Sequence, residues 1–140
     1  MTGSICYGAA EKQAAGRLIE AALAEDLGTA GDITSRSFLS PKLTGGVVIT
    51  AREPGRLAGL PIVEQVFGAI DKRVEVTRKL EEGDELRPGS VVAELRGPTL
   101  SLLEGERTAL NFLTHLCGIA TLTAKFVEAV RGTGAEILDT

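Results

Sequence analysis

Glu106-Arg107-Thr108-Ala109-Leu110-Asn111-Phe112 is the stretch of this chain that says most about its structure. Its spacing predicts a helix, because Leu103 lies four residues before Arg107 and Leu110 lies three residues after it, on roughly one face. A guanidinium beside an apolar ridge costs free energy unless it has a partner. One interpretation pairs Arg107 with Glu104 in water. The other is a planar substrate with two carboxylates, which would fit the rigid fork of an arginine.

The composition is that of an ordinary globular protein. The chain has 140 residues, is 44% hydrophobic and carries a formal net charge of −4, which is enough for one domain with a core. An acidic chain with no Trp and 4% aromatic residues lacks the basic face and stacking platforms of nucleic-acid binders. The N-terminus does not read as a secretory signal, and no apolar run approaches the about 20 residues of a membrane span. We therefore expect a cytoplasmic protein with no nucleic-acid and no membrane partner.

The cysteines and the single histidine predict no metal site built on imidazoles or paired thiols. Cys6 and Cys117 are far apart, and we expect both to be free thiols, with Cys117 a small buried side chain. Free thiols suit a reducing cytoplasm. His115 reads as a polar helix residue rather than as a catalytic base, and neither a Cys-x-x-Cys nor a paired-histidine motif occurs.

Apolar periodicity divides the chain into helices and short strands. We predict helices over residues 9–27, 61–70, 99–117 and 119–131, with Gly118 between the last two, and strands over residues 46–53, 57–60, 73–80, 91–95 and 135–138. Residues 28–41 read as a turn-rich loop, and residues 132–134 as a helix cap and turn. Residues 135–138 include Ala135, Ile137 and Leu138, and we expect the unpaired edges of this strand to promote self-association.

The stretch from Leu80 to Leu95 resembles the hammerhead hairpin of biotinyl and lipoyl carrier domains, which carry a similar Gly-Asp-x-Leu-x-x-Gly pattern. A carrier presents a lysine at the tip of its hairpin. The nearest lysines, Lys72 and Lys79, do not read as tip residues. We therefore predict a hammerhead-type sheet, and a non-catalytic carrier or binding module is the alternative function from another class.

Several motifs in one order resemble the quinolinate phosphoribosyltransferase family, the carboxylating nicotinate-nucleotide pyrophosphorylases. The motifs are Ala22–Gly28, Gly31–Thr34, Ala51–Leu60, Glu106–Thr123 and Gly132–Thr140. The resemblance implies an α+β fold, in which a hammerhead-type N-terminal sheet with helices is followed by the truncated start of an α/β barrel. It places the N-terminal domain at residues 1–112 and the start of the barrel domain at residues 113–140. We expect the rest of the barrel, beginning with an Arg-Lys-Thr segment, to be missing from this chain.

The resemblance also implies an activity, the joining of quinolinate to phosphoribosyl pyrophosphate. This reaction yields nicotinate mononucleotide, pyrophosphate and CO2 in NAD biosynthesis. By the same resemblance, Arg107 would bind a quinolinate carboxylate in the active site of a partner subunit, and Asp139 and Thr140 would begin a substrate-binding segment. A homodimer or higher homo-oligomer is implied, as is Mg2+ with ligands absent from this chain. A related phosphoribosyltransferase-like protein, the molybdenum-transport-associated relative, is the alternative within the fold. With one candidate arginine, we expect no complete catalytic site and no activity of the isolated chain.

Overall fold

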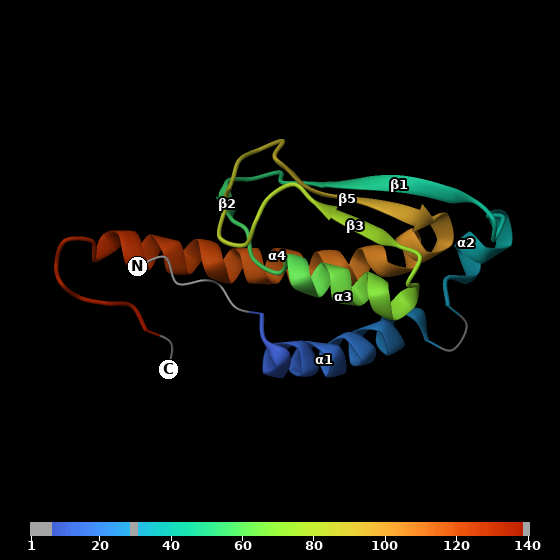
Figure 1. Cartoon of the computed structure of the whole chain (residues 1–140), viewed down its shortest axis with the longest axis horizontal. Coiled ribbons are helices and arrows are strands. Elements are labelled where there is room, and N and C mark those ends of the chain that lie inside the picture. Colours follow the sequence, from blue (N-terminus) through green and yellow to red (C-terminus); the bar gives the residue numbers. More distant parts are fainter. Residues whose placement is uncertain (1–6, 29–30, 139–140) are drawn as a thin grey trace.

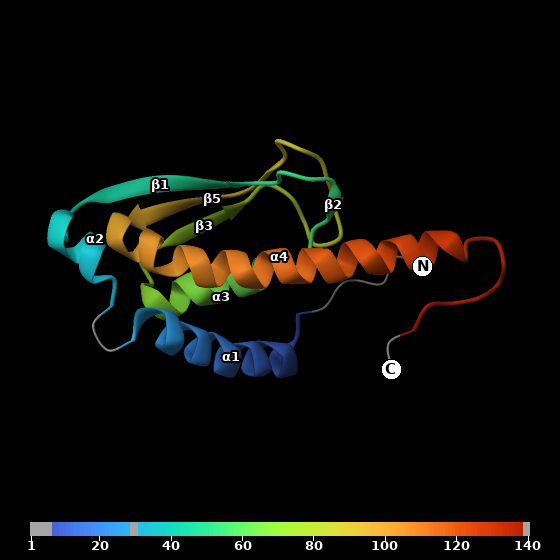
Figure 2. The same cartoon turned by 180° about the vertical axis from the view of Figure 1, so that it is seen from behind.

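A small antiparallel sheet lies over two helices, α3 and α4, and a third helix, α1, packs beneath them (Figures 1 and 2). The structure is a computed structural model that describes residues 7–28 and 31–138. The elements in chain order are α1 (Ala9–Leu27), α2 (Ile33–Phe38), β1 (Thr44–Thr50), β2 (Gly55–Arg56), α3 (Leu60–Ile70), β3 (Glu75–Arg78), β4 (Glu85–Leu86), β5 (Val91–Pro98) and α4 (Thr99–Ala129). This arrangement confirms the predicted α+β class and the sheet with helices.

The main sheet has the strand order β1-β5-β3, and β2 pairs separately with β4. A register shift interrupts the β1–β5 pairing, since Ile49 lies opposite Ala93 but Thr50 lies opposite Val91. Val92 is the extra residue of this bulge, and it is buried beside Ala93. Ala93 is therefore buried, whereas Val91 is exposed, because the bulge interrupts the alternation of the strand.

The helix α1 has the predicted bounds, and it ends at Gly28. Gly28 has a φ of 54°, and its N–H donates to the carbonyl of Ala24. The buried residues of α1 are Ala15 and Ile19, one turn apart. The neighbouring Leu18 is exposed, because α1 meets α3 and α4 along the narrow line of Ala15 and Ile19.

Two predicted segments differ from the structure on either side of β1. The predicted loop over residues 28–41 contains the short helix α2. Asp32 caps the N-terminus of this helix, because its side chain accepts the N–H of Ser35 at 3.0 Å. The predicted strand 57–60 is absent, because α3 already begins at Leu60. The carboxylate of Glu82 accepts the N–H groups of Gly59 and Leu60, and this supplies the cap that Gly59 lacks.

The two helices predicted around Gly118 form one continuous helix of 31 residues, α4. A glycine in a helix interior costs only about 1 kcal/mol, and contacts on both sides of Gly118 hold the helix. Cys117 contacts the backbone of Ala58, and the hydroxyl of Thr121 accepts the N–H of Arg56 at 2.8 Å. The predicted domain boundary between residues 112 and 113 falls inside α4 and stays a prediction.

The two halves of α4 differ in burial. Its first four turns supply core residues that include Leu102, Ala109 and Leu113. Its second half projects from the body of the molecule (Figure 1), and the side chains of Ile119, Leu122, Phe126 and Val127 there are exposed. By length and composition alone α4 is a candidate membrane span. One such helix is weak evidence for a membrane span, and the buried side chains in the first half of α4 belong to the core beneath the sheet.

The segment after α4 is a turn followed by irregular chain. Gly132 and Gly134 have φ values of 79° and 80°, which confirms the predicted cap and turn. The predicted strand 135–138 is wrong, because these residues form no ladder and Leu138 is exposed. A strand needs a neighbouring edge for its hydrogen bonds, and the part of the chain that the structure describes pairs none with it.

Candidate functional site

Arg107 lies on the exposed side of α4, where its side chain is 76% exposed. Its Nη1 donates to Oδ1 of Asp26 at 2.8 Å. Asp26 belongs to the last turn of α1, and its side chain is only 18% exposed. The interpretation that pairs Arg107 with Glu104 is wrong, because Glu104 lies on the buried side of α4 and has another partner.

That partner of Glu104 is Arg36, at the C-terminal turn of α2. Glu104 is 8% exposed, and one of its oxygens accepts from Nε and Nη2 of Arg36 at 3.0 and 2.8 Å. The backbone N–H of Asp32 donates to the same oxygen at 3.4 Å. A buried carboxylate needs such partners. These bonds fasten α2 to α4.

The guanidinium of Arg107 keeps one side open. Among the described residues, Nη1 is its only nitrogen with a hydrogen-bond partner. The other side of the fork, formed by Nε and Nη2, faces away from that bond. An arginine uses this edge for two parallel hydrogen bonds to a carboxylate, as Arg78 does with Glu64 here, at 2.6 and 2.7 Å. Arg107 therefore retains the capacity to bind a further carboxylate.

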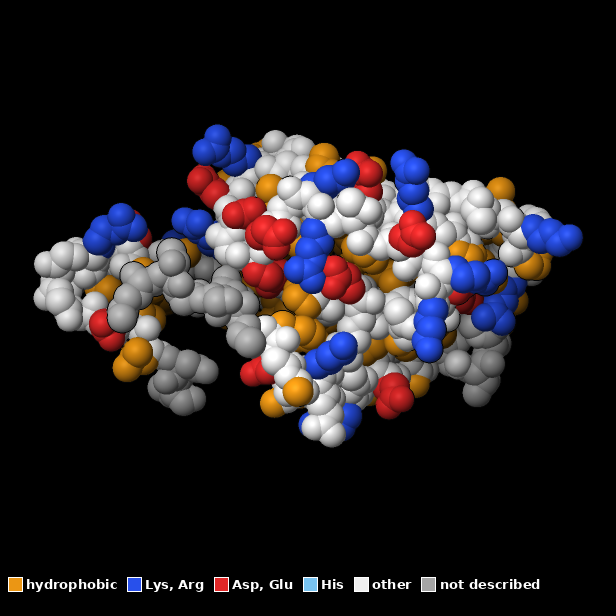
Figure 3. Space-filling model, in the orientation of Figure 1, with side chains coloured by type: hydrophobic (Ala, Val, Ile, Leu, Met, Phe, Trp, Pro, Cys, Tyr) orange, Lys and Arg blue, Asp and Glu red, His pale blue; other side chains and the backbone are white. Residues whose placement is uncertain are grey.

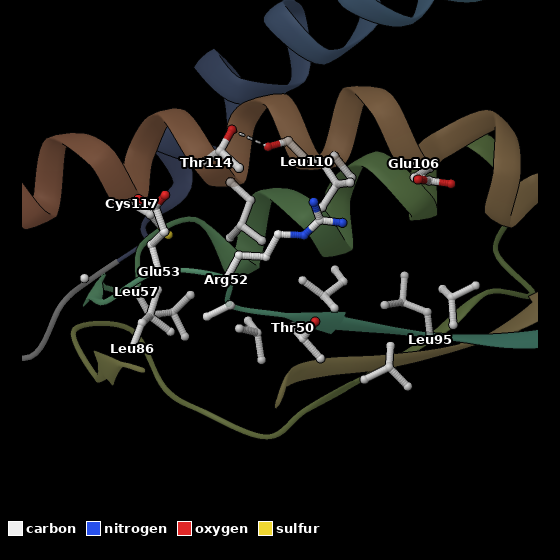
Figure 4. Close-up of a pocket in the computed structure, with 18 of the residues that line it drawn as sticks. Thr50, Arg52, Glu53, Leu57, Leu86, Leu95, Glu106, Leu110, Thr114 and Cys117 are labelled. Carbon is white, nitrogen blue, oxygen red and sulfur yellow. Dashed lines mark hydrogen bonds between the residues drawn. The ribbon is translucent and has the colours of Figure 1, made fainter. Parts of the chain in front are cut away.

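A second feature is a cavity of about 810 Å³ between β1 and the first half of α4 (Figure 4). Its walls are mostly apolar and include Leu103 and Leu110, the ridge residues of the sequence pattern. Arg52, in the loop after β1, extends its guanidinium toward Leu110 (Figure 4). The sequence did not single out Arg52, because an arginine after a strand is an ordinary surface residue until the opposite wall is known. Arg107 is not among the residues that line this cavity.

Cys117 lies at the wall of the same cavity and is a free cysteine, as predicted. Its Sγ lies 3.4 Å from both the N and the O of Ala58. Burial raises the pKa of the Cys117 thiol, so it stays protonated near neutral pH and is a poor nucleophile. Cys6 lies outside the described residues.

The other predicted residues are placed as follows. Asp139 and Thr140 lie outside the described residues, so their predicted role is untested. His115 is exposed on α4, which fits a polar helix residue. Lys79 pairs with Glu94 at 3.2 Å across the sheet, and the β4–β5 turn over residues 87–90 contains no lysine. The hairpin therefore lacks the feature that a carrier module requires.

The charged side chains form no single-sign surface on the face that Figure 3 shows. Lys and Arg side chains alternate there with Asp and Glu side chains, and hydrophobic side chains lie between them. Mixed charges of this kind are typical of a soluble surface and differ from the basic stripe of a nucleic-acid interface.

Comparisons with known proteins give one consistent family. Residues 32–117 match the sequence model described as "Quinolinate phosphoribosyl transferase, N-terminal domain". A nicotinate-nucleotide pyrophosphorylase (carboxylating) of Mycobacterium leprae is 39% identical over 138 residues, which cover 93% of this chain and 46% of that protein. A probable enzyme of the same name from Bacillus subtilis is 38% identical over 83% of this chain and 39% of that protein. The chain thus spans less than half the length of these relatives.

A solved structure gives the same result. The nicotinate-nucleotide pyrophosphorylase of Francisella tularensis superposes with a TM-score of 0.81 at 30% sequence identity. The superposition covers 86% of this chain and 43% of that one. The matched sequence segment runs from Asp32 to Cys117 and contains Arg107.

Proposed function

This chain belongs to the quinolinate phosphoribosyltransferase family, and from that premise we propose that it is the N-terminal part of such an enzyme. The proposed enzyme converts quinolinate and phosphoribosyl pyrophosphate to nicotinate mononucleotide, pyrophosphate and CO2, and so serves NAD biosynthesis. We propose a cytoplasmic location and a homodimeric or higher assembly as parts of the same function.

The observation that carries this proposal is the open edge of the Arg107 guanidinium, inside the segment that matches the family. Quinolinate has two carboxylates on neighbouring ring positions, and each is a planar acceptor for an arginine fork. Arg107 is held at one nitrogen by Asp26 and offers Nε and Nη2 to a ligand. We propose that this edge binds one carboxylate of quinolinate.

The exposure of Arg107 supports a site shared between subunits. The side chain points away from the core and does not line the apolar cavity of its own domain. One guanidinium balances only one of the two carboxylates of quinolinate, and the diphosphate adds further charge. We propose that Arg107 completes the active site of a partner subunit, which supplies the remaining cationic groups.

The described residues do not fit the Mg2+ that the family resemblance implies. Within residues 7–28 and 31–138 no group of three or more His, Cys, Asp or Glu side chains is placed to hold a metal ion. A Mg2+ ion would bind the diphosphate of phosphoribosyl pyrophosphate through oxygen ligands. We assign it no ligand in this part of the molecule and no step of the function proposed here.

The test is a product assay on a full-length protein that includes these 140 residues. Purified enzyme is given phosphoribosyl pyrophosphate with either quinolinate or nicotinate, and nicotinate mononucleotide and CO2 are measured. We expect product and stoichiometric CO2 with quinolinate only. Turnover of a different base, with none from quinolinate, would favour the molybdenum-transport-associated relative and refute the proposal. Mass spectrometry of the protein would reveal a biotinyl or lipoyl adduct if it were a carrier.

A further inference from the structure

We infer that Asp26 is a positioning residue for Arg107, and that it turns the Nε–Nη2 edge of the guanidinium toward a carboxylate of the substrate. The inference rests on the proposed function and names a residue that acts on the substrate only through Arg107. The two residues are 81 positions apart in sequence, and a bond of 2.8 Å joins Nη1 to Oδ1.

The placement of Asp26 is unfavourable for α1 by itself. Asp26 lies in the last turn of the helix, which has no basic residue. A carboxylate there faces the partly negative end of the helix dipole, an arrangement that typically destabilises a helix by about 0.3–1 kcal/mol. The side chain is also mostly covered. A carboxylate at an unfavourable position in its own helix indicates a role in contacts outside that helix. The ion-pair partner of Asp26 is Arg107.

The nearby acidic residue Glu104 is not available to Arg107, and Asp26 is the carboxylate that binds it. Glu104, one turn earlier on α4, is occupied by Arg36 and faces the core. Without Asp26 the long, exposed arginine side chain would sample many rotamers, and a ligand would have to order it at the cost of side-chain entropy. With Nη1 held by Asp26, the guanidinium samples fewer orientations, and the Nε–Nη2 edge remains for a ligand. Asp26 thus orients the fork before a ligand arrives.

The first arm of the test uses the 140-residue chain and the Nε–Hε signal of Arg107 in an NMR spectrum, assigned by its loss in Arg107→Lys. We expect Asp26→Ala to shift and broaden this signal, because the guanidinium loses its anchor. Glu25→Ala is the matched control, since it removes a neighbouring exposed carboxylate of the same charge. An Arg107 signal that Asp26→Ala leaves unchanged would overturn the inference.

The second arm measures steady-state kinetics in the full-length protein. We expect Asp26→Ala to raise the KM for quinolinate about fivefold, the factor that corresponds to about 1 kcal/mol. The KM for phosphoribosyl pyrophosphate should stay within twofold. Asp26→Asn, which keeps an acceptor oxygen without the charge, should fall between wild type and Asp26→Ala. Because Asp26 opposes the dipole of α1, neither variant should lower the thermal unfolding midpoint by more than the Glu25→Ala control.

The outcomes separate this inference from the proposed function. Normal quinolinate KM in Asp26→Ala, together with impaired turnover in Arg107→Ala, overturns the role of Asp26 and leaves the proposed function standing. Equal increases in both KM values also overturn it, because a general structural defect has that effect. A wild-type protein that does not consume quinolinate overturns the proposed function and this inference with it.

Discussion

Arg107 combines high exposure with a single partner among residues 7–28 and 31–138, and this makes its chemistry testable at the level of one side chain. In a full-length protein, Arg107→Ala should lower kcat/KM for quinolinate about 10- to 150-fold, since a charge-assisted hydrogen bond is worth about 1.5–3 kcal/mol. Arg107→Lys should recover little of this loss, because a point charge cannot replace the fork. Near-normal quinolinate kinetics in the lysine variant would contradict bidentate binding.

Among the described residues, Asp71 has a carboxyl group whose pKa is strongly lowered by its hydrogen bonds. Its carboxylate accepts from the backbone and side chain of Arg73 and from the hydroxyl of Ser101, at the point where α3 and the start of α4 meet. The Arg73 and Ser101 hydrogen bonds hold the pKa of Asp71 well below its usual range. Because the folded pKa is depressed, the stabilisation is present above the unfolded pKa near 4 and is lost as pH falls toward the folded pKa.

The corresponding experiment is urea unfolding of wild type and Asp71→Asn between pH 6 and pH 2. Wild type should be the more stable of the two at pH 6, and the difference should shrink steadily below about pH 4. Glu20→Gln, a change to an exposed carboxylate on α1, is the control. A difference between wild type and Asp71→Asn that does not depend on pH would show that Asp71 acts through shape alone.

At the scale of elements, the packing of α3 against α4 depends on the missing side chain of Gly105. A Cβ at this position would lie 2.5 Å from Cε1 of Phe67 and 2.9 Å from Cδ1 of Ile70. Gly105→Ala should therefore destabilise the fold by about 1–3 kcal/mol, as overpacking does, although alanine is the better helix former. Thermal or urea unfolding measures the change.

Gly118 provides the matched control on the same helix. A Cβ at Gly118 meets no atom within 4 Å, so Gly118→Ala should stabilise α4 by up to about 1 kcal/mol. The two substitutions are chemically identical and should have opposite signs. If both stabilised the protein, the close contact between α3 and α4 at Gly105 would be refuted.

At the scale of the whole molecule, the second half of α4 exposes a row of large apolar side chains. They are Ile119, Leu122, Phe126 and Val127. Apolar patches of this kind promote association. The 140-residue chain should therefore self-associate in light scattering at high concentration, and the double substitution Leu122→Glu and Phe126→Glu should shift it toward monomer. Deletion of residues 135–140 should change association less, because residues 135–138 form no strand. A wild-type chain that is monomeric at all concentrations would contradict this expectation.

The isolated chain should also form no nicotinate mononucleotide from quinolinate and phosphoribosyl pyrophosphate. Arg107 is the single substrate-binding arginine proposed in it, and it cannot balance two carboxylates and a diphosphate. The chain also spans less than half the length of its relatives. Chromatography of the reaction mixture is the measurement, with a full-length relative as the positive control. Product above the background rate from the isolated chain would show that the site is more complete than proposed.

Local pattern in the sequence determined much of this molecule. The helix over residues 9–27, the start of α3 near Pro61 and the alternation along β3 follow from the periods of 3.6 and 2 that the sequence displays. The family, and Arg107 as the candidate binding residue, also follow from motifs in sequence order. These features depend on periodicity within one segment or on the order of motifs along the chain. They can therefore be predicted without knowing which helices and strands pack together.

The tertiary structure alone decided the partners. Glu104 lies close to Arg107 in sequence but binds Arg36, 68 positions away, and Arg107 binds Asp26, 81 positions away. The helix α4 runs on through Gly118, and on either side of it Cys117 and Thr121 contact Ala58 and Arg56 from the β2 region. The reason is physical. Periodicity specifies which side of an element is buried, whereas the identity of a charge partner depends on how separate elements pack, which no local pattern encodes.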